Sequence, residues 1–345
     1  LTEETAVSSI ETAAEKLQKT GGTIVILDDM TINLDKYEVT ASAHRIYTPS
    51  TESTIYIRGV KKSDNTYTKL SFYSSSDKAP CLELGGPLVI YNLTMAVTSK
   101  SNIWMSANGH DLTIGVNVNF ELASGFEARF CSGRQDNTNS GAMAADASST
   151  LNFYSGNIGE VYGGSYAQAH VVNGDVTINV MGGTFKSIFL QRSGANMKGN
   201  KVLNVYGGTV TNKILIYSSK NVVNIYDSAV SQTLISQGTG AEVTINELTG
   251  SVPAFQAPKV NVSLVEETGQ ENISKLTGAD QYYVGDNVTI KAAVKSGEKY
   301  VFDKWVNINN PNEVVYSPVH SFRANANVAY KAVFKQLAKY SVTVS

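Results

Sequence analysis

Residues 151–252 repeat one short unit, and its clearest copies read Ile178-Asn179-Val180-Met181-Gly182-Gly183 and Leu203-Asn204-Val205-Tyr206-Gly207-Gly208. The five asparagines of the repeat are spaced by 27, 25, 20 and 22 residues, and they are Asn152, Asn179, Asn204, Asn224 and Asn246. Six positions after each asparagine comes an apolar residue, the last of them Val252. A short unit that recurs at such a period is typical of a solenoid, in which each coil stacks on the previous one.

Each copy reads as a short strand followed by a sharp corner. Apolar residues flank the asparagine, and such alternation places neighbouring side chains on opposite faces of a strand. A Gly-Gly pair follows in two copies, because glycine enters positive φ without steric cost. Parallel coils about 4.8 Å apart would align equivalent side chains, so we expect the asparagines to form a structural ladder. Alternation favours an outward column of stacked amides, and an inward column at a corner is the alternative.

Charge and composition exclude several classes of partner. The net charge of −2 and a pI of about 6.1 provide no basic surface for nucleic acid. No apolar run approaches the roughly 20 residues of a membrane span, so we expect no membrane insertion. The two cysteines, Cys81 and Cys131, fit no metal pattern. Two buried free thiols are the favoured interpretation, although a disulfide between them stays open, as does the oligomeric state.

The N-terminus predicts a capping helix over about residues 8–21. Its apolar face has the helical spacing, Ser8 with Glu11 makes a capping box, and Gly21-Gly22 ends the helix. The face consists of Ile10, Ala13, Ala14 and Leu17. The β run at residues 23–27 follows, and a helix placed here would cover the open edge of the first coil.

This opening resembles the start of pectate-lyase-like β-helix proteins, of the bacterial cell-surface or adhesin type. The resemblance implies an all-β chain whose residues 1–255 form a right-handed parallel β-helix, with regular coils at 150–252. Strand-like runs at residues 54–59, 88–93 and 112–114 are expected to be earlier coils with longer insertions. Residues 129–149 are poor in β-formers and are expected to be a loop off the coil.

After residue 255 the composition changes and a second domain is predicted at residues 256–338. Strand-like runs at residues 260–263, 283–292 and 297–305, followed by Phe322 and residues 332–334, resemble the internalin-type B-repeat of bacterial surface proteins. The insert at residues 307–318 is longer than is usual in that family. Residues 339–345 look like the start of a further repeat. The resemblance implies a fragment of a longer secreted or cell-surface protein.

The pectate-lyase-like fold hosts lyases, hydrolases and non-enzymatic adhesins, so chemistry must come from the residues. A lyase would need acids that hold Ca²⁺ together with an Arg or Lys base, and a glycosidase would need two carboxylates on one face. Acids in the regular coils are sparse and do not recur at the coil period. We expect no metal site and no cofactor, except Ca²⁺ under a lyase hypothesis. The candidates for catalysis are Arg134, Asp136, His170 and Arg192.

Recognition is the other hypothesis for the same region. Tyr162, Tyr166 and Arg129 are candidate ligand-binding residues, because an exposed tyrosine is flat and amphipathic and can stack on a sugar or anchor a protein. We therefore predict a non-enzymatic adhesin that binds a glycan or a host protein, with a B-repeat spacer. A polysaccharide lyase or glycoside hydrolase acting on an acidic polysaccharide is the alternative. A purely structural stalk is the second alternative.

Overall fold

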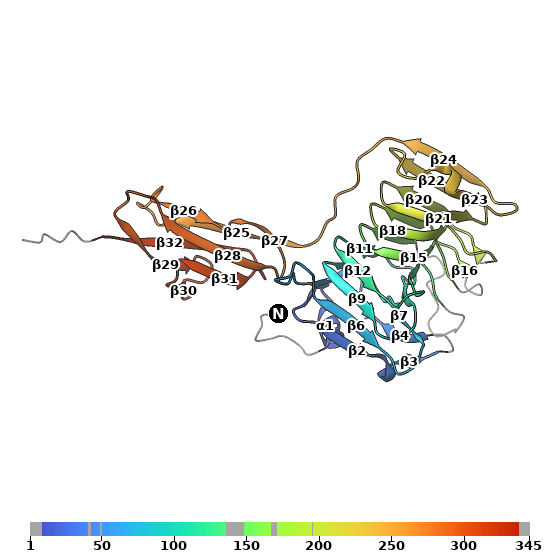
Figure 1. Ribbon diagram of the computed structural model, residues 1–345, viewed down its shortest axis with the longest axis horizontal. Coiled ribbons are helices and arrows are strands. Elements are labelled where there is room, and N and C mark those ends of the chain that lie inside the picture. Colours follow the sequence, from blue (N-terminus) through green and yellow to red (C-terminus); the bar gives the residue numbers. More distant parts are fainter. Residues whose placement is uncertain are drawn as a thin grey trace, which may run out of the picture. The chain divides into compact units, whose positions relative to one another are not determined.

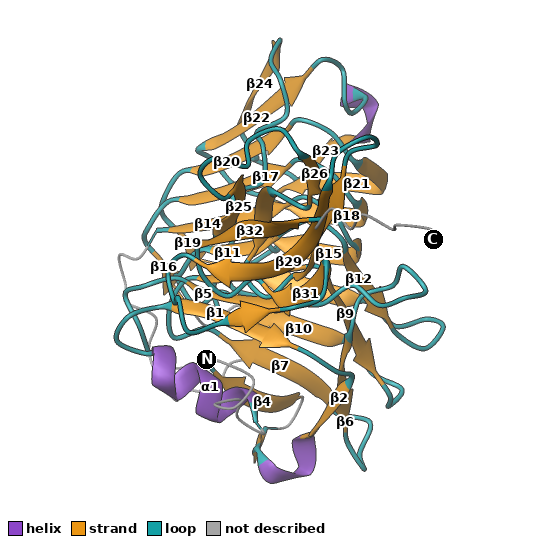
Figure 2. Cartoon of the chain, turned by 90° about the vertical axis from the view of Figure 1, so that its left-hand side faces the viewer, coloured by secondary structure: helices purple, strands orange, loops and turns teal. Residues whose placement is uncertain are grey.

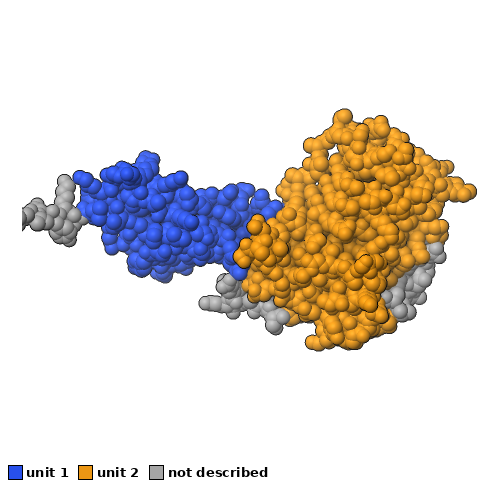
Figure 3. Space-filling view, viewed as in Figure 1, with its two compact units in different colours: residues 1–6, 257–345 blue, residues 7–256 orange. Residues whose placement is uncertain are grey.

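The computed structural model describes residues 9–40, 43–48, 50–135, 148–166, 171–194 and 196–337. The chain divides into two compact units (Figure 3), which are a solenoid within residues 7–256 and a C-terminal unit that begins at residue 257. Both consist mainly of strands, so the predicted all-β class is confirmed. No helix in these described ranges is long and apolar enough to cross a membrane.

Three parallel sheets, here called A, B and C, build the solenoid (Figure 1). Sheet A contains β1 (Gly22–Ile26), β5 (Ile55–Gly59), β8 (Leu88–Tyr91), β11 (Leu112–Ile114), β14 (Ser149–Phe153), β17 (Val176–Val180), β20 (Lys201–Val205), β22 (Asn221–Tyr226) and β24 (Val243–Leu248). Sheet B contains β2 (Met30–Asn33), β6 (Lys69–Tyr73), β9 (Leu93–Val97) and β12 (Val118–Glu121). Sheet C contains β4 (Ala43–Tyr47), β7 (Ala79–Glu83), β10 (Ile103–Ser106), β13 (Ala128–Cys131), β15 (Asn157–Tyr162), β18 (Thr184–Phe189), β21 (Thr209–Ile216) and β23 (Ile235–Gln237).

Coils in the first half of the solenoid have three strands, and later coils have two. The chain passes through sheets A, B and C in turn until β13, whereas from β14 onward it passes directly from sheet A to sheet C. The predicted earlier coils are confirmed, since Ile24 pairs with Ile57 and Ile57 pairs with Ile90, at intervals of 33 residues. Shorter elements flank the coils: η2 (Leu34–Lys36), η3 (Gln232–Leu234), an antiparallel β3 (Glu38–Val39) beside β4, and a β16 (Val171–Val172) to β19 (Asn196–Met197) pair.

Side chains that point inward from the sheets form one continuous apolar core. The inward column of sheet C shows the pattern, with one residue from each coil stacked on the next: Ile46, Leu82, Met105, Phe130, Val161, Ile188 and Ile214. Four phenylalanines also stack edge to face inside the core, with successive centroids 5.8, 5.1 and 5.4 Å apart, namely Phe120, Phe130, Phe153 and Phe185. Full burial of one such side chain contributes about 1.5–3 kcal/mol, so burial across coils is the main force that stacks them.

The predicted helix is present as α1 (Ile10–Leu17) (Figure 2). Its apolar face packs against the solenoid core. Ala13 and Ala14 are buried there. The cap differs from the prediction, because Ser9 is the N-cap and its Oγ accepts a hydrogen bond from the backbone N–H of Thr12. Ser8 lies outside the described residues. Gly21 ends the helix at φ 65°, with its N–H donating to Leu17 O over 2.8 Å.

The asparagine ladder forms on the outer face of sheet A, as alternation predicted. Register pairs the asparagines of successive coils directly, and each half-buried asparagine follows a residue that packs in the core. The amide Nδ2 of each asparagine donates to Oδ1 of the asparagine one coil earlier over 2.7–2.8 Å. At the N-terminal end, Asn152 donates to Thr113 Oγ1 over 3.1 Å. The ladder therefore adds one side-chain hydrogen bond to each coil contact.

Corners follow the ladder, and in the two Gly-Gly copies of the repeat a glycine adopts the left-handed backbone of the corner. Gly183 and Gly208 have φ of 91° and 79°, and the N–H of Thr209 donates to Gly183 O over 2.9 Å. The fourth copy of the repeat makes its corner without glycine, because Asp227 and Ser228 adopt φ of 49° and 58°. The glycine pair is therefore one solution to the corner and not a requirement of every coil.

Two expectations for loop and coil positions are wrong. Residues 129–131 belong to strand β13 of sheet C, and Ser149 begins β14, so the loop expected over 129–149 is shorter. Residues 136–147 lie outside the described ranges. Val252 does not occupy a coil position, because it follows β24 in an extended segment and is 49% exposed.

The C-terminal unit has two sheets that enclose a separate small core. One sheet contains β27 (Asp280–Tyr283), β25 (Lys259–Glu266), β32 (Val328–Gln336), β29 (Tyr300–Asn307) and β30 (Val314–Val315), and the other contains β26 (Ser274–Thr277), β28 (Asn287–Val294) and β31 (Val319–Arg323). All pairs are antiparallel except β25 with β32. Trp305 is fully buried in this core.

Replacing one ladder asparagine tests the contribution of its amide. Asn204→Ala removes two amide bonds, to Asn179 and to Asn224, whereas Asn246→Ala removes one. We expect the free energy of unfolding to fall by about 2 kcal/mol for Asn204→Ala and by about 1 kcal/mol for Asn246→Ala. Urea unfolding would be followed by Trp104 emission in a Trp305→Phe background, which isolates the solenoid. Equal losses in the two variants would contradict a ladder of additive bonds.

Candidate functional site

Two columns of side chains point outward from sheet C, away from the solenoid core. Strand register aligns the first column as Arg45, Cys81, Trp104, Arg129, Glu160, Ser187 and Lys213. The second column, two positions further along each strand, is Tyr47, Glu83, Ser106, Cys131, Tyr162, Phe189 and Leu215. Many of these outward side chains are nevertheless buried, so they form a second buried cluster on the outer face of sheet C.

Aromatic rings form an outer cluster on this face. Tyr162 is only 4% exposed, and its ring stacks on Phe189 at a centroid distance of 4.7 Å and faces Trp104 at 6.2 Å. Tyr166 is half-buried and lies against Trp104 at 4.6 Å and Tyr162 at 5.1 Å. Burial and the hydrogen bond from its hydroxyl to Glu160 raise the pKa of Tyr162, so this phenol stays protonated. Trp104 is buried in this cluster and not in the solenoid core.

Arg129 is the centre of an ion-pair group beside the rings. Its guanidinium lies 5.6 Å from the centroid of Trp104 and pairs with Glu127 and Glu160, both over 3.2 Å. Glu127 also binds Lys186. Burial alone would raise the pKa of Glu127, but the bonds from Lys186 and Arg129 outweigh it and hold that pKa below its usual value. Glu127 is therefore ionised at neutral pH, and both carboxylates are paired with cations.

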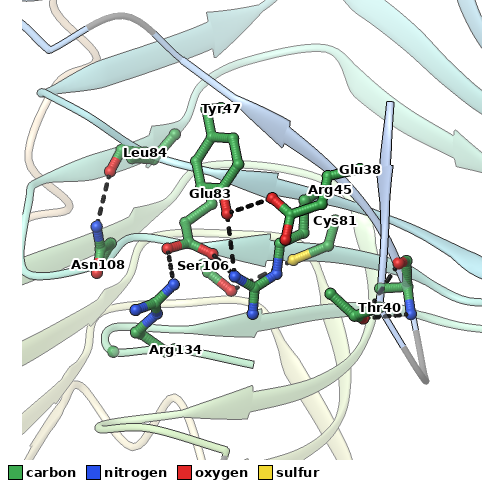
Figure 4. Close-up of polar contacts among 12 residues, drawn as sticks. Glu38, Thr40, Arg45, Tyr47, Cys81, Glu83, Leu84, Ser106, Asn108 and Arg134 are labelled. Carbon is green, nitrogen blue, oxygen red and sulfur yellow. Dashed lines mark hydrogen bonds and ion pairs between the residues drawn. The ribbon is translucent and has the colours of Figure 1, made fainter. Parts of the chain in front are cut away.

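A buried carboxylate lies between two arginines at the N-terminal end of the same face (Figure 4). Glu83 pairs with Arg134 through Oε1 and Nη2 at 2.6 Å and with Arg45 through Oε2 and Nη1 at 3.7 Å. All three side chains are nearly inaccessible, with 2% exposure or less for the arginines and 3% for Glu83. Arg134 is brought here because its N–H donates to Ser165 Oγ and its carbonyl accepts from the N–H of Tyr166. The group is a structural ion triad, since buried charges persist only when paired.

The two thiols are free and buried, as the favoured interpretation predicted. Both sulfur atoms approach Ser106 Oγ, over 3.5 Å for Cys81 and 3.4 Å for Cys131. Strand β10 lies between their strands, so their Cα atoms are separated by at least two interstrand spacings, about 9.5 Å. A disulfide needs Cα atoms within about 7 Å, so register excludes the pair that the sequence left open. Burial also raises the pKa of Cys81, which keeps the thiol protonated.

Most predicted site residues that the structure describes lie on this face. Arg129, Tyr162 and Tyr166 share the aromatic cluster, and the Arg192 guanidinium lies 3.9 Å from the ring centroid of Tyr166. Arg134 lies near them, but its guanidinium pairs with Glu83 in the ion triad. Asp136 and His170 lie outside the described residues. No group of three His, Cys, Asp or Glu side chains within the described ranges could hold a metal ion.

Sequence reasoning missed Glu83, Arg45 and Glu160, which complete the site. Their sequence neighbours give no motif, and the intervals between aligned residues of sheet C vary with the length of each coil's insertions. The available signal was Pro80-Cys81-Leu82-Glu83, where a charged residue follows an apolar strand at an outward position. That signal identifies a strand face and does not identify its cross-strand partners.

Removing the charge of Glu83 tests the triad. Glu83→Gln would leave two buried guanidinium groups without their shared carboxylate, so we expect the solenoid to lose about 3–5 kcal/mol of unfolding free energy. Glu121→Gln is the matched control, because its ion pair with Lys69 is 46% exposed on the glutamate side and is expected to contribute less than about 1 kcal/mol. Urea unfolding followed by Trp104 emission measures both. Similar losses would show that burial does not set the strength of the triad.

Thiol chemistry tests the register of sheet C. We expect Ellman's reagent to leave the native protein unreacted, because Cys81 and Cys131 are 1% and 0% exposed. In denaturant without reductant it should then count two thiols per chain, because the strand spacing excludes a disulfide. A count of zero after aerobic purification would contradict the arrangement of β7, β10 and β13.

No family model, no curated protein and no solved structure matches this chain in the comparisons with known proteins.

Proposed function

We propose that this is a non-enzymatic, secreted or cell-surface protein whose solenoid binds an extracellular glycan on the outer face of sheet C. The state of the carboxylates there carries the proposal. Glu83, Glu127 and Glu160 are each held by arginine or lysine, so none is poised as a general acid or as a nucleophile. Such a face is better suited to recognition than to turnover.

The proposed contact region is a surface of four side chains, here called the Tyr166 surface: Tyr166, Arg192, Arg129 and Lys186. Arg192 stacks on the ring of Tyr166 and also donates to the Tyr166 carbonyl, which orients both groups. Lys186 is 53% exposed and Arg129 is 23% exposed. Tyrosine offers a flat amphipathic surface for a sugar ring, and guanidinium groups bind carboxylate or sulfate. An acidic glycan is therefore the ligand class that suits this surface best.

The C-terminal unit would then be a spacer. The resemblance of its sequence to a B-repeat suggests this role, and its core is separate from that of the solenoid. In a protein of the pectate-lyase-like type, such a spacer would carry the binding solenoid away from the cell wall. This part of the proposal rests on the resemblance together with the separation of the two cores.

Binding measurements on the full chain test the ligand class. Immobilised pectate, alginate, hyaluronan and heparin would be compared with neutral glucan and galactan. We expect binding to at least one acidic glycan, weakened about tenfold or more by Tyr166→Ala and by Arg192→Ala, because a central aromatic or arginine contact contributes about 1.4 kcal/mol or more. Tyr73→Ala is the control, since Tyr73 is 45% exposed on another sheet.

The same samples distinguish the alternatives. New unsaturated uronate absorbance would support a lyase, new reducing ends would support a hydrolase, and either would overturn the proposal. Binding that is unaffected by both substitutions would move the site away from the Tyr166 surface. Binding only to a protein, or no binding at all, would reject the glycan and favour a protein ligand or a structural stalk.

A further inference from the structure

A column of large side chains on the outer face of sheet A is interrupted by one glycine. The column lies beside the asparagine ladder and consists of Arg58, Tyr91, Gly115, Tyr154, Met181, Tyr206 and Tyr226. Backbone bonds place Gly115 between its neighbours, since its N–H donates to Ile90 O and the N–H of Tyr154 donates to Ile114 O. Gly115 is not in the left-handed region, so the backbone does not require a glycine there. The missing side chain leaves a notch between Tyr91 and Tyr154.

Phe255 fills this notch. Its ring centroid lies 5.5 Å from that of Tyr91 and 5.2 Å from that of Tyr154. A Cβ atom at Gly115 would come within 2.6 Å of two atoms of the Phe255 ring, closer than real contacts allow. Tyr91 is fully buried at this place. The glycine and the phenylalanine, 140 positions apart in the sequence, therefore form one fitted contact.

Phe255 belongs to the segment 249–256, here called the strap, which follows β24 and runs back along the solenoid (Figure 1). The strap lies within the solenoid unit. Its hydrogen bonds to the coils are long: Gly250 N–H reaches Asp227 Oδ2 at 3.5 Å, and the Tyr154 hydroxyl reaches Ala254 O at 3.5 Å. Gly250 also lies beside the ring of Tyr226, and the Val252 side chain lies near Gly207. Residues 251–254 are exposed. The Phe255 ring in the Gly115 notch is consequently the main anchor of residues 249–255.

We propose that the strap is a releasable tether, in which Phe255 in the Gly115 notch holds the chain against the solenoid and gives way before any coil unfolds when the C-terminal unit is pulled. Without this anchor, a pull on the chain would act directly at Leu248, the end of β24. That strand has a single neighbour, β22, in sheet A. The anchor moves the load to coils that are bonded on both sides. This inference does not depend on the proposed glycan ligand.

Single-molecule pulling on the full chain, held at its two ends, tests the proposal. Release of residues 249–255, seven residues at about 3.3–3.6 Å each, should appear as a first extension of about 23–25 Å, before the much longer steps of unit unfolding. Phe255→Ala should abolish this first step, and Gln256→Ala, an exposed neighbour, should keep it. A wild-type trace without the step, or a step that persists in Phe255→Ala, would overturn the proposal.

Limited proteolysis gives an independent test without force. Proteinase K cleavage within residues 249–256 would be mapped from the mass of the released C-terminal unit. We expect Phe255→Ala to raise the cleavage rate at least tenfold and Gln256→Ala to leave it unchanged, with Trp104 emission confirming that the solenoid stays folded. Gly115→Val, which fills the notch and leaves the strap sequence intact, should raise the rate in the same way. Cleavage at the wild-type rate in Phe255→Ala would overturn the anchor.

Discussion

Parallel stacking in register is the constraint on which the solenoid depends. Every coil bonds its backbone to the next coil along sheets A and C, so equivalent residues lie directly above one another. A residue type that recurs in each coil therefore forms a column. Such a column is stable only if neighbouring copies of the residue interact favourably. Asparagine satisfies this condition because its amide carries both a donor and an acceptor. The inward phenylalanines satisfy it by packing edge to face.

The same constraint creates the outer face of sheet C. Charged residues from different coils are forced into contact, and each charge needs a partner of opposite sign because water is excluded. Glu83 lies between two arginines, and Arg129 lies between two glutamates, so the signs alternate along the face. Aromatic rings cover the space between the two groups. The outcome is a largely neutralised face that carries the partly exposed side chains of the Tyr166 surface.

Gly115 interrupts the outer column of sheet A and thereby makes room for a side chain from a distant part of the sequence. Each other position in this outer column carries a large side chain. At Gly115 the space left by the missing side chain is filled by the ring of Phe255. A glycine in a solenoid therefore has two distinct uses here. Gly183 serves a left-handed corner of the backbone, whereas Gly115 serves a side chain that arrives from residue 255.

The sequence by itself determined the solenoid, the outward asparagine ladder and the capping helix, because these depend on local alternation and on one repeated unit. It also indicated that Arg129, Tyr162, Tyr166 and Arg192 belong to one region. Only the tertiary structure decided that Tyr162 is covered, that Glu83 joins Arg134, and that Cys81 and Cys131 lie too far apart to bridge. Those facts depend on which residues of successive coils are aligned, and insertions of unequal length hide that alignment. The contact of Phe255 with Gly115 could not be predicted either, because a contact between residues 140 positions apart leaves no periodic pattern in the sequence.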